Sequence, residues 1–244
     1  MIKYIEIASL AILLLLTSCK HSAKDMAVIT CDFSGAAGVK LILLEMDTRE
    51  IHQVDSTTFD NNGKHTFNPA IKETGFWLLK AQTGKILVLM LNSGDQVDLS
   101  GNFIDFPDNI RVKAPKDAML LVDFFHQTRT NERMVDSLDM LLAERQDSSD
   151  YYNLTQKLDT SFRQIWENQR ALEIAFIKNH SGSLASLVVL NYAFGMSPVL
   201  NMDEDFRYYQ ALDSTLSVSF PANKHVMFHH QRVMEYQRKT VKNK

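Results

Sequence analysis

Cysteine is scarce in this chain, and its scarcity excludes one class of chemistry. The 244 residues contain only two cysteines, Cys19 and Cys31, and no C-x-x-C pair. Exchange between a dithiol and a disulfide needs two thiols, so it cannot run within one molecule once Cys19 has another role. The sequence also lacks a Gly-x-Ser-x-Gly elbow, a phosphate loop and a dinucleotide fingerprint. No motif therefore dictates a reaction.

An excess of one charge and a long apolar run are missing as well. The 26 basic residues are scattered among 29 acidic ones, and the net charge is −3. This pattern gives no electrostatic footprint for nucleic acid, which is not expected as a partner. The longest apolar run, Ile7 to Leu16, is well short of the roughly 20 residues of a membrane-spanning helix. Because 45% of the residues are hydrophobic, the chain can still bury a core, as one large or two small domains.

The N-terminus has the layout of a secretory signal. Lys3 precedes the apolar run, and small residues follow it. The four residues Leu16-Thr17-Ser18-Cys19 resemble the bacterial lipoprotein box. That resemblance implies that residues 1–18 are removed and that Cys19 carries a thioether-linked diacylglycerol and further acyl chains such as palmitate, which together anchor a protein durably. The alternative is an ordinary signal peptide with a chance cysteine.

The next two segments differ in character. Residues 19–27 are mostly polar or have short side chains, and they are expected to form a tether. Residues 28–114 carry short runs rich in aliphatic and aromatic residues, separated by turn residues, of which Asn62-Gly63 is the strongest hairpin signal. Such runs predict an antiparallel β-sandwich or open barrel. Cys31 shares the alternation of its apolar neighbours, so we expect it to face the sheet core.

Residues 115–240 change to a period of about three and a half, which is typical of amphipathic helices. Two long helices are expected to pair as an antiparallel hairpin, with an interruption at "TRTNE" left open. A central buried helix and two further helices should follow. These helices are expected at Lys116–Arg145, Tyr151–Phe176, Ser183–Phe194, from a cap at Asp203 and from about Asn223. The predicted fold class is α+β, an N-terminal antiparallel β-sandwich or open barrel followed by a C-terminal α-helical bundle.

Several stretches between about Val28 and His230 carry a family likeness, among them "VDSTTFDNNGKHTF", "GFWLLKAQTGKILVLMLNSGDQVDLSG" and "NHSGSLASLVVLNYAF". They resemble a domain of unknown function and its helical linker in Bacteroidetes envelope lipoproteins. In longer relatives these parts precede a thioredoxin-like module of the AhpC/TSA type with a Trp-Cys-x-x-Cys pair. This chain ends at Lys244 without that module, so an oxidoreductase activity is not expected.

The best metal candidate is the segment "HVMFHHQ", in which His225 and His229 lie one turn apart on a predicted helix. No third ligand is evident, and the glutamate that a metalloprotease needs after its first histidine is missing. The alternative is a partly exposed polar helix face. We therefore expect no metal and no cofactor, with His225 and His229 kept as candidates.

Three further groups of residues have both a structural and a functional interpretation. The acidic run Asp203-Glu204-Asp205 is expected to complement a helix dipole. Phe76 and Trp77 could form a ligand platform, although at least one should face the core. Ser56, Ser137 and Ser214 each follow an aspartate and resemble an O-glycosylation pattern of exported Bacteroidetes proteins; the alternative is that these serines brace turns and helices.

These patterns together predict a non-catalytic, lipid-anchored protein of the cell envelope that binds an envelope protein or a small ligand. The anchor would hold it on a membrane facing the periplasm, and the outer membrane is favoured over the inner one. The alternative is an accessory to thiol–disulfide or peroxide chemistry, which docks a separate thioredoxin-like protein with or without a role for Cys31.

Overall fold

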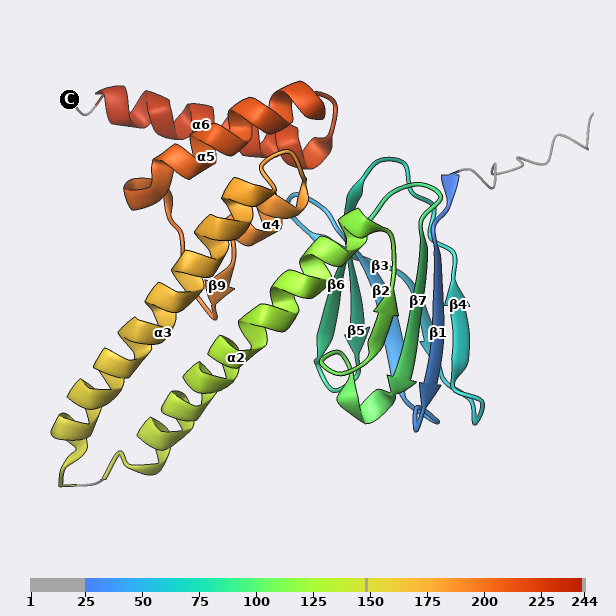
Figure 1. Cartoon of the computed structure of the whole chain (residues 1–244), viewed down its shortest axis with the longest axis horizontal. Helices are drawn as coiled ribbons and strands as arrows, with labels where there is room; N and C mark the ends of the chain where they lie inside the picture. The colour runs from blue at the N-terminus through green and yellow to red at the C-terminus, as the bar shows by residue number, and fades with distance from the viewer. Residues whose placement is uncertain (1–24, 148, 243–244) are drawn as a thin grey trace, which may run out of the picture.

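The computed structural model describes residues 25–147 and 149–242, and it confirms the predicted α+β class (Figure 1). Strands come first and helices follow. The strands of the first half are β1 (Val28–Ser34), β2 (Lys40–Met46), β3 (Ile51–Thr58), β4 (Lys64–Phe67), β5 (Gly75–Ala81), β6 (Ile86–Leu91), β7 (Gln96–Asn102) and β8 (Arg111–Lys113), with the short 3₁₀ helix η3 (Phe103–Asp105) before β8. The second half contains α2 (Lys116–Glu144), α3 (Tyr151–Asn179), α4 (Ala185–Leu190), the small strands β9 (Ala193–Phe194) and β10 (Ser197–Pro198), α5 (Met202–Ser219) and α6 (Lys224–Lys242).

The strands of the first half form a sandwich of two four-stranded sheets. The first sheet has the order β4-β1-β7-β8 and the second the order β3-β2-β5-β6. All strand pairs in the two sheets are antiparallel except β1 and β7, which run parallel with Val28 opposite Gln96 and Ser34 opposite Asn102. The alternation of one strand does not specify the direction of its neighbour, so the sequence did not reveal this pair.

The space between the sheets is filled by alternate side chains of both. Phe33 meets Phe59, Phe103 and Phe106 edge to face, with ring centroids 5.4 to 6.0 Å apart. Cys31 is fully buried in the same core, as its alternation predicted. Burial of about twenty apolar side chains is the main force that holds the two sheets together.

The fold begins earlier than the sequence suggested. Met26 forms a bridge with Ala70, and the N–H of the fully buried Ala27 donates to the carbonyl of Pro69 at 3.0 Å. The Asp25 carbonyl also accepts from the N–H of Ile71 at 2.7 Å. The tether predicted for residues 19–27 was therefore wrong for its last three residues, because their backbone is paired with the sandwich. Cys19 and residues 1–18 lie outside the described residues.

The hairpin predicted at Asn62-Gly63 was also wrong. β3 belongs to the second sheet and β4 to the first, so this turn carries the chain from one sheet to the other. Gly63 has φ +65° and accepts a hydrogen bond from the N–H of Phe33 at 2.9 Å. A Cβ at position 63 would lie 1.9 Å from the Phe33 carbonyl oxygen. Glycine is thus required for a close approach between backbones as well as for its left-handed conformation.

The helical half covers the second sheet and shares a core with it. Phe76 and Met90 point away from the sandwich interior and pack with Leu121 and Phe124 of α2 and with the later helices. β5 and β6 are therefore buried on both faces, while β1 and β7 alternate between buried and exposed residues. Figure 1 shows α2 running from the sheet edge and α3 returning beside it, with α5 and α6 across the end at which α2 begins and α3 ends.

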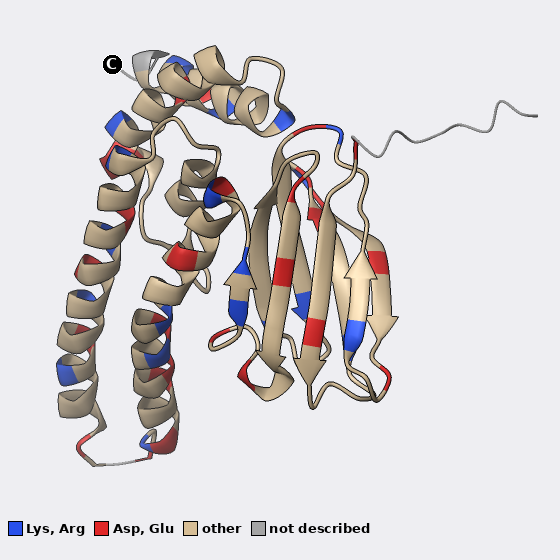
Figure 2. Ribbon diagram, turned by 45° about the vertical axis from the view of Figure 1, so that its right-hand side comes forward, with Lys and Arg blue, Asp and Glu red and all other residues tan. Residues whose placement is uncertain are grey.

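The long helices α2 and α3 form the predicted antiparallel hairpin. The segment "TRTNE" is continuous helix, because Gln169 of α3 donates to Thr128 at 3.2 Å and accepts from Asn131 at 3.0 Å. Basic and acidic residues alternate along both helices (Figure 2). Interspersed charges of both signs are typical of a solvated helix surface.

Two predicted helix boundaries need correction. The helix expected over Ser183–Phe194 is only Ala185–Leu190, because Asn191 ends it and the next residues form the β9–β10 hairpin around Gly195. The cap of α5 is Asn201 rather than Asp203, since the Asn201 side chain accepts from the N–H groups of Asp203 and Glu204, both at 3.0 Å. An asparagine side chain accepts hydrogen bonds at a helix N-cap as well as an aspartate does. The cap was predicted at Asp203 because an acidic run is typical of the start of a helix.

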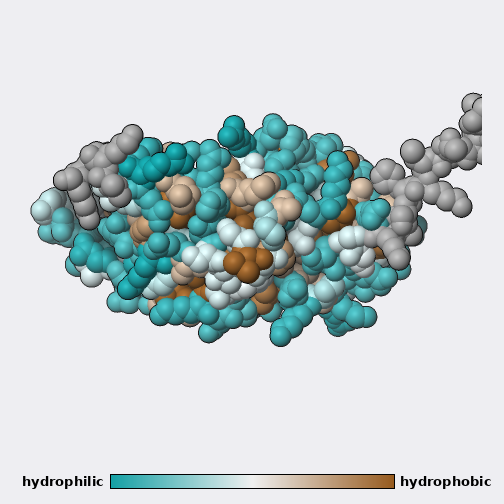
Figure 3. Space-filling model, turned by 90° about the horizontal axis from the view of Figure 1, so that it is seen from above, coloured by the Kyte–Doolittle hydropathy of each residue, from teal (hydrophilic) through white to brown (hydrophobic). Residues whose placement is uncertain are grey.

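The face of the molecule seen from above is mostly hydrophilic, with small separate hydrophobic patches (Figure 3). In the part of the chain that the structure describes, no helix has the length and apolar character needed to cross a membrane.

Candidate functional site

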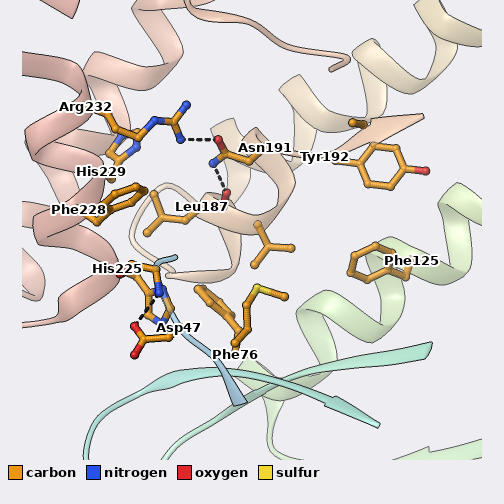
Figure 4. A pocket seen from close by; sticks show the side chains of 14 residues that line it. Asp47, Phe76, Phe125, Leu187, Asn191, Tyr192, His225, Phe228, His229 and Arg232 are labelled. Atoms are coloured by element: carbon orange, nitrogen blue, oxygen red, sulfur yellow. Dashed lines mark hydrogen bonds between the residues drawn. The ribbon is translucent and has the colours of Figure 1, made fainter. Parts of the chain in front are cut away.

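A cleft of about 440 Å³ lies where the second sheet meets the helices (Figure 4). Its walls come from the end of β2, from β5, from α2, from the α4 segment and from α6. Most of them are apolar. The residues that line it are Met46, Asp47, Thr48, Phe76, Phe125, Leu187, Val188, Asn191, Tyr192, Ala193, His225, Phe228, His229 and Arg232.

One face of α6 forms a wall of this cleft. His225, Phe228, His229 and Arg232 follow the spacing i, i+3, i+4 and i+7, which places them on the same side of a helix. The helix start is fixed to the sandwich by Asn223, whose side chain accepts from the N–H of His225 at 3.0 Å and donates to the carbonyl of Thr74 at 2.8 Å. This double role of Asn223 holds the wall in place against β5.

Lys224 strengthens the same junction. Its ammonium group lies 2.7 Å from Glu45 and 3.5 Å from Asp47. The hydrogen bond that Asp47 accepts from the Thr48 N–H at 2.6 Å and the charge of Lys224 lower the pKa of Asp47. The carboxylate at this end of the cleft is therefore ionised and already paired with a cation.

His225 is 8% exposed and packs its ring against Phe76, with centroids 4.8 Å apart. Its Nε2 has no hydrogen-bond partner among the described residues. Burial, helped by the charge of Lys224, lowers the pKa of His225 to about 4. The imidazole is therefore neutral at physiological pH, and a buried polar nitrogen at the cleft wall stays unsatisfied.

His229 is 3% exposed, and its Nε2 lies 3.0 Å from the carbonyl oxygen of Tyr209. Because a carbonyl can only accept, Nε2 carries the proton and Nδ1 keeps a lone pair. That Nδ1 has no partner among the described residues. Burial lowers the pKa of His229, so this ring is neutral as well.

Arg232 is held at the α4 side of the cleft by a chain of two hydrogen bonds (Figure 4). Its Nη1 donates to Asn191 Oδ1 at 2.9 Å, and Asn191 Nδ2 donates to the Leu187 carbonyl at 2.7 Å. Since the Leu187 carbonyl only accepts, the orientation of the Asn191 amide is fixed with its oxygen toward Arg232. The guanidinium group is thus positioned by a neutral partner.

The two metal candidates meet in this cleft, yet they do not make a complete site. No group of three or more histidine, cysteine or acidic side chains is arranged to hold a metal within residues 25–147 and 149–242. The alternative of a partly exposed polar face was wrong for His225 and His229, which are buried. It fits only their neighbour His230, whose Nδ1 lies 3.0 Å from Asp213.

Sequence reasoning missed a buried polar network between α2 and α3. Gln169 donates to Glu173 Oε1 at 3.1 Å, while Glu173 Oε2 has no partner among the described residues. Beside it, Arg170 donates to both carboxylate oxygens of Asp205, which is 1% exposed. The acidic run at positions 203–205 thus includes an ion pair that ties α5 to α3. Only the aspartate itself was visible in the sequence, because its partner is 35 residues away.

Among the remaining candidates, Phe76 and Trp77 pack into two different cores, and the serines and Cys31 lie away from the cleft. Phe76 faces the helices and Trp77 the sandwich interior, so both are buried. Ser137 and Ser214 sit on helices and donate to the carbonyls of the residues four positions earlier, at 2.7 and 2.9 Å. Ser56 lies on the edge strand β3. Burial raises the pKa of the Cys31 thiol to about 12, so it is neither accessible nor ionised.

Comparisons with models of protein families and with curated proteins both return no match.

Proposed function

We propose that this protein is a non-catalytic, lipid-anchored component of the cell envelope that binds a small, largely apolar ligand in the cleft between its sandwich and its helices. The cleft is the observation that carries the proposal. Its volume of about 440 Å³ falls in the range of small-molecule sites, which lie preferentially where two structural units meet.

The composition of the walls supports binding rather than catalysis. Aromatic and aliphatic side chains dominate, and two neutral histidines contribute nitrogen atoms that have no partner among the described side chains and backbone. A few fixed polar groups within an apolar wall orient a ligand. Neither histidine is hydrogen-bonded to a carboxylate or to a nucleophilic side chain that it could activate.

The likeness of residues 16–19 to a lipoprotein box supports the anchor, and the likeness to Bacteroidetes envelope lipoproteins supports the location. With the lipid on Cys19, the few residues before the described fold could extend at most ~20 Å. The cleft would then stay close to the membrane, which we propose is the outer one.

Binding in the cleft can be tested with the apolar fluorescent probe N-phenyl-1-naphthylamine. We expect saturable binding with one probe per protein. Val188 lines the cleft, so Val188→Trp should fill it and abolish binding. The matched control is Val54→Trp, because Val54 is exposed on the edge strand β3. Equal binding by wild type and Val188→Trp would sink the proposed site.

The anchor is tested separately. Cys19→Ala, or treatment with globomycin, should leave an unprocessed and unlipidated precursor. Separation of inner and outer membranes on a density gradient should place the wild-type protein in the outer fraction. Normal processing of Cys19→Ala would contradict the anchor, and recovery in the inner fraction would contradict the location.

The alternative is an accessory to thiol–disulfide chemistry, and the environment of Cys31 does not support a role for its thiol. The side chain is fully buried in the sandwich core, and a thiol with a pKa of about 12 is protonated at neutral pH. A mixed disulfide at this position would require the sandwich to open. A Cys31→Ser variant that forms no partner complex while the wild type does would restore the alternative.

A further inference from the structure

Arg232 is a fixed cation at one end of the cleft. Its only hydrogen bond within the described part of the chain, to Asn191 at 2.9 Å, uses one of the five N–H groups of the guanidinium. It forms no ion pair with an acidic residue among the described positions 25–147 and 149–242. A guanidinium next to an apolar wall, with donors to spare, is a ready partner for an anion.

The other charged groups around the cleft are already balanced. Asp47, the only carboxylate among the described residues that line it, lies at the opposite end and is paired with Lys224 at 3.5 Å. His225 and His229 are neutral at physiological pH, since burial lowers the pKa of each. The cleft is therefore positive at the Arg232 end, and its middle is apolar.

We propose that the cleft binds an amphiphile with a carboxylate head, which pairs with Arg232 while its hydrocarbon tail lies over Phe228, Phe76 and Phe125. A single planar guanidinium fork matches the two oxygens of a carboxylate, whereas a phosphate dianion would call for more than one cation. This inference rests on the proposed function, because it names the ligand class of the same cleft.

The arrangement of the walls supports this orientation. Arg232 and Phe228 are one helical turn apart on α6, and Phe76 lies across the cleft on β5 beside His225 (Figure 4). A tail that starts at Arg232 would therefore run toward the sandwich. His225 Nε2, buried and without a partner, could accept or donate one hydrogen bond to a polar group farther along the ligand.

Calorimetry on residues 20–244, which contain the whole described fold, tests the head group with three probes that share one tail: decanoate, decanol and decyl phosphate. We expect decanoate to bind about tenfold to hundredfold more tightly than decanol, the usual effect of a charge-assisted hydrogen bond. Arg232→Gln should remove this margin, so that decanoate and decanol bind the variant with similar affinity. Arg238→Gln, with the same change of charge on the same helix but outside the cleft, should keep the margin.

The outcomes separate the two proposals. Equal binding of decanoate and decanol by the wild type, or a margin that survives Arg232→Gln, would overturn the carboxylate head and leave the apolar cleft intact. Tighter binding of decyl phosphate than of decanoate would overturn the choice of carboxylate. If the wild type binds none of the probes, including N-phenyl-1-naphthylamine, the proposed function itself fails. Thermal unfolding of each variant checks that the fold is retained.

Discussion

At the scale of single residues, Glu173 has a strongly raised side-chain pKa. It is fully buried between α2 and α3, and burial raises its pKa from 4.5 to about 8. Between these two values the folded protein holds a proton that the unfolded chain releases. Stability conferred by the protonated form is complete below about pH 4.5 and is lost as the pH rises toward 8.

Replacing Glu173 by glutamine should remove that dependence, because an amide mimics the protonated carboxyl. The wild type should lose roughly 2 kcal/mol of unfolding free energy between pH 5 and pH 7 through this group. Glu173→Gln should lack this loss and be the more stable protein at pH 8. Urea unfolding between pH 5 and pH 8 measures the free energy of unfolding of both proteins. The control is Glu167→Gln, because Glu167 is exposed on the same helix. An unchanged slope in Glu173→Gln would assign the pH dependence to other groups.

Gly63 gives a second prediction at this scale. Gly63→Ala should cost at least about 2 kcal/mol, because the new Cβ meets the Phe33 backbone and the left-handed conformation disfavours a side chain. Gly84 also has a positive φ, but nothing lies within 4 Å of its Cβ position. Gly84→Ala should therefore cost only about 1 kcal/mol. Chemical denaturation of the two variants compares them, and equal losses would show that the close approach to Phe33 is unimportant.

At the scale of elements, α6 depends on Asn223 for its contact with the sandwich. Asn223→Ala should remove the helix cap and leave the Thr74 carbonyl unpaired, at a cost of about 2 kcal/mol in total. Asn201→Ala removes a comparable cap from α5 without a bond to the sheets, and should cost about 1 kcal/mol. Hydrogen exchange should show faster exchange at the start of α6 in Asn223→Ala only. If exchange there stayed slow, another contact would be holding the cleft wall.

The elements themselves were largely visible in the sequence. β5 and β6 read as continuous hydrophobic runs, while β1 and β7 alternate. This difference indicates which sheet is covered on both faces. A strand that is buried on both faces lacks the alternating polar residues of a strand with one solvent-exposed face. The contrast between the two kinds of strand is therefore a sequence signal that assigns the helices to the second sheet.

The candidate site was visible only in part, for a physical reason. The spacing of His225 and His229 follows from helix geometry, which is local, and it correctly placed the two side chains on one face of α6. Their burial and the relay from Leu187 through Asn191 to Arg232 depend on how α4 and α6 pack together. Partners 41 residues apart leave no periodic signal in a single sequence.

At the scale of the whole molecule, the shared core should make the two halves unfold together. Trp77 lies in the sandwich interior and Trp166 on α3, so each half has its own fluorescent reporter. In the single variant Trp166→Phe, we expect the fluorescence of Trp77 and the far-UV circular dichroism of the helices to show coincident transitions in urea, since Phe76 and Met90 of the sandwich share a core with the helices. Two separated midpoints would show that the halves are independent.

The position of β1 has a mechanical consequence. This first strand lies inside its sheet, with β4 on one side and the parallel β7 on the other. In a protein held by its N-terminus, a pulling force enters the fold along β1. The ladders to β4 and β7 lie across that pull, so their hydrogen bonds share the load and must yield together. The strand that follows the proposed anchor is thus the one best placed to resist extraction.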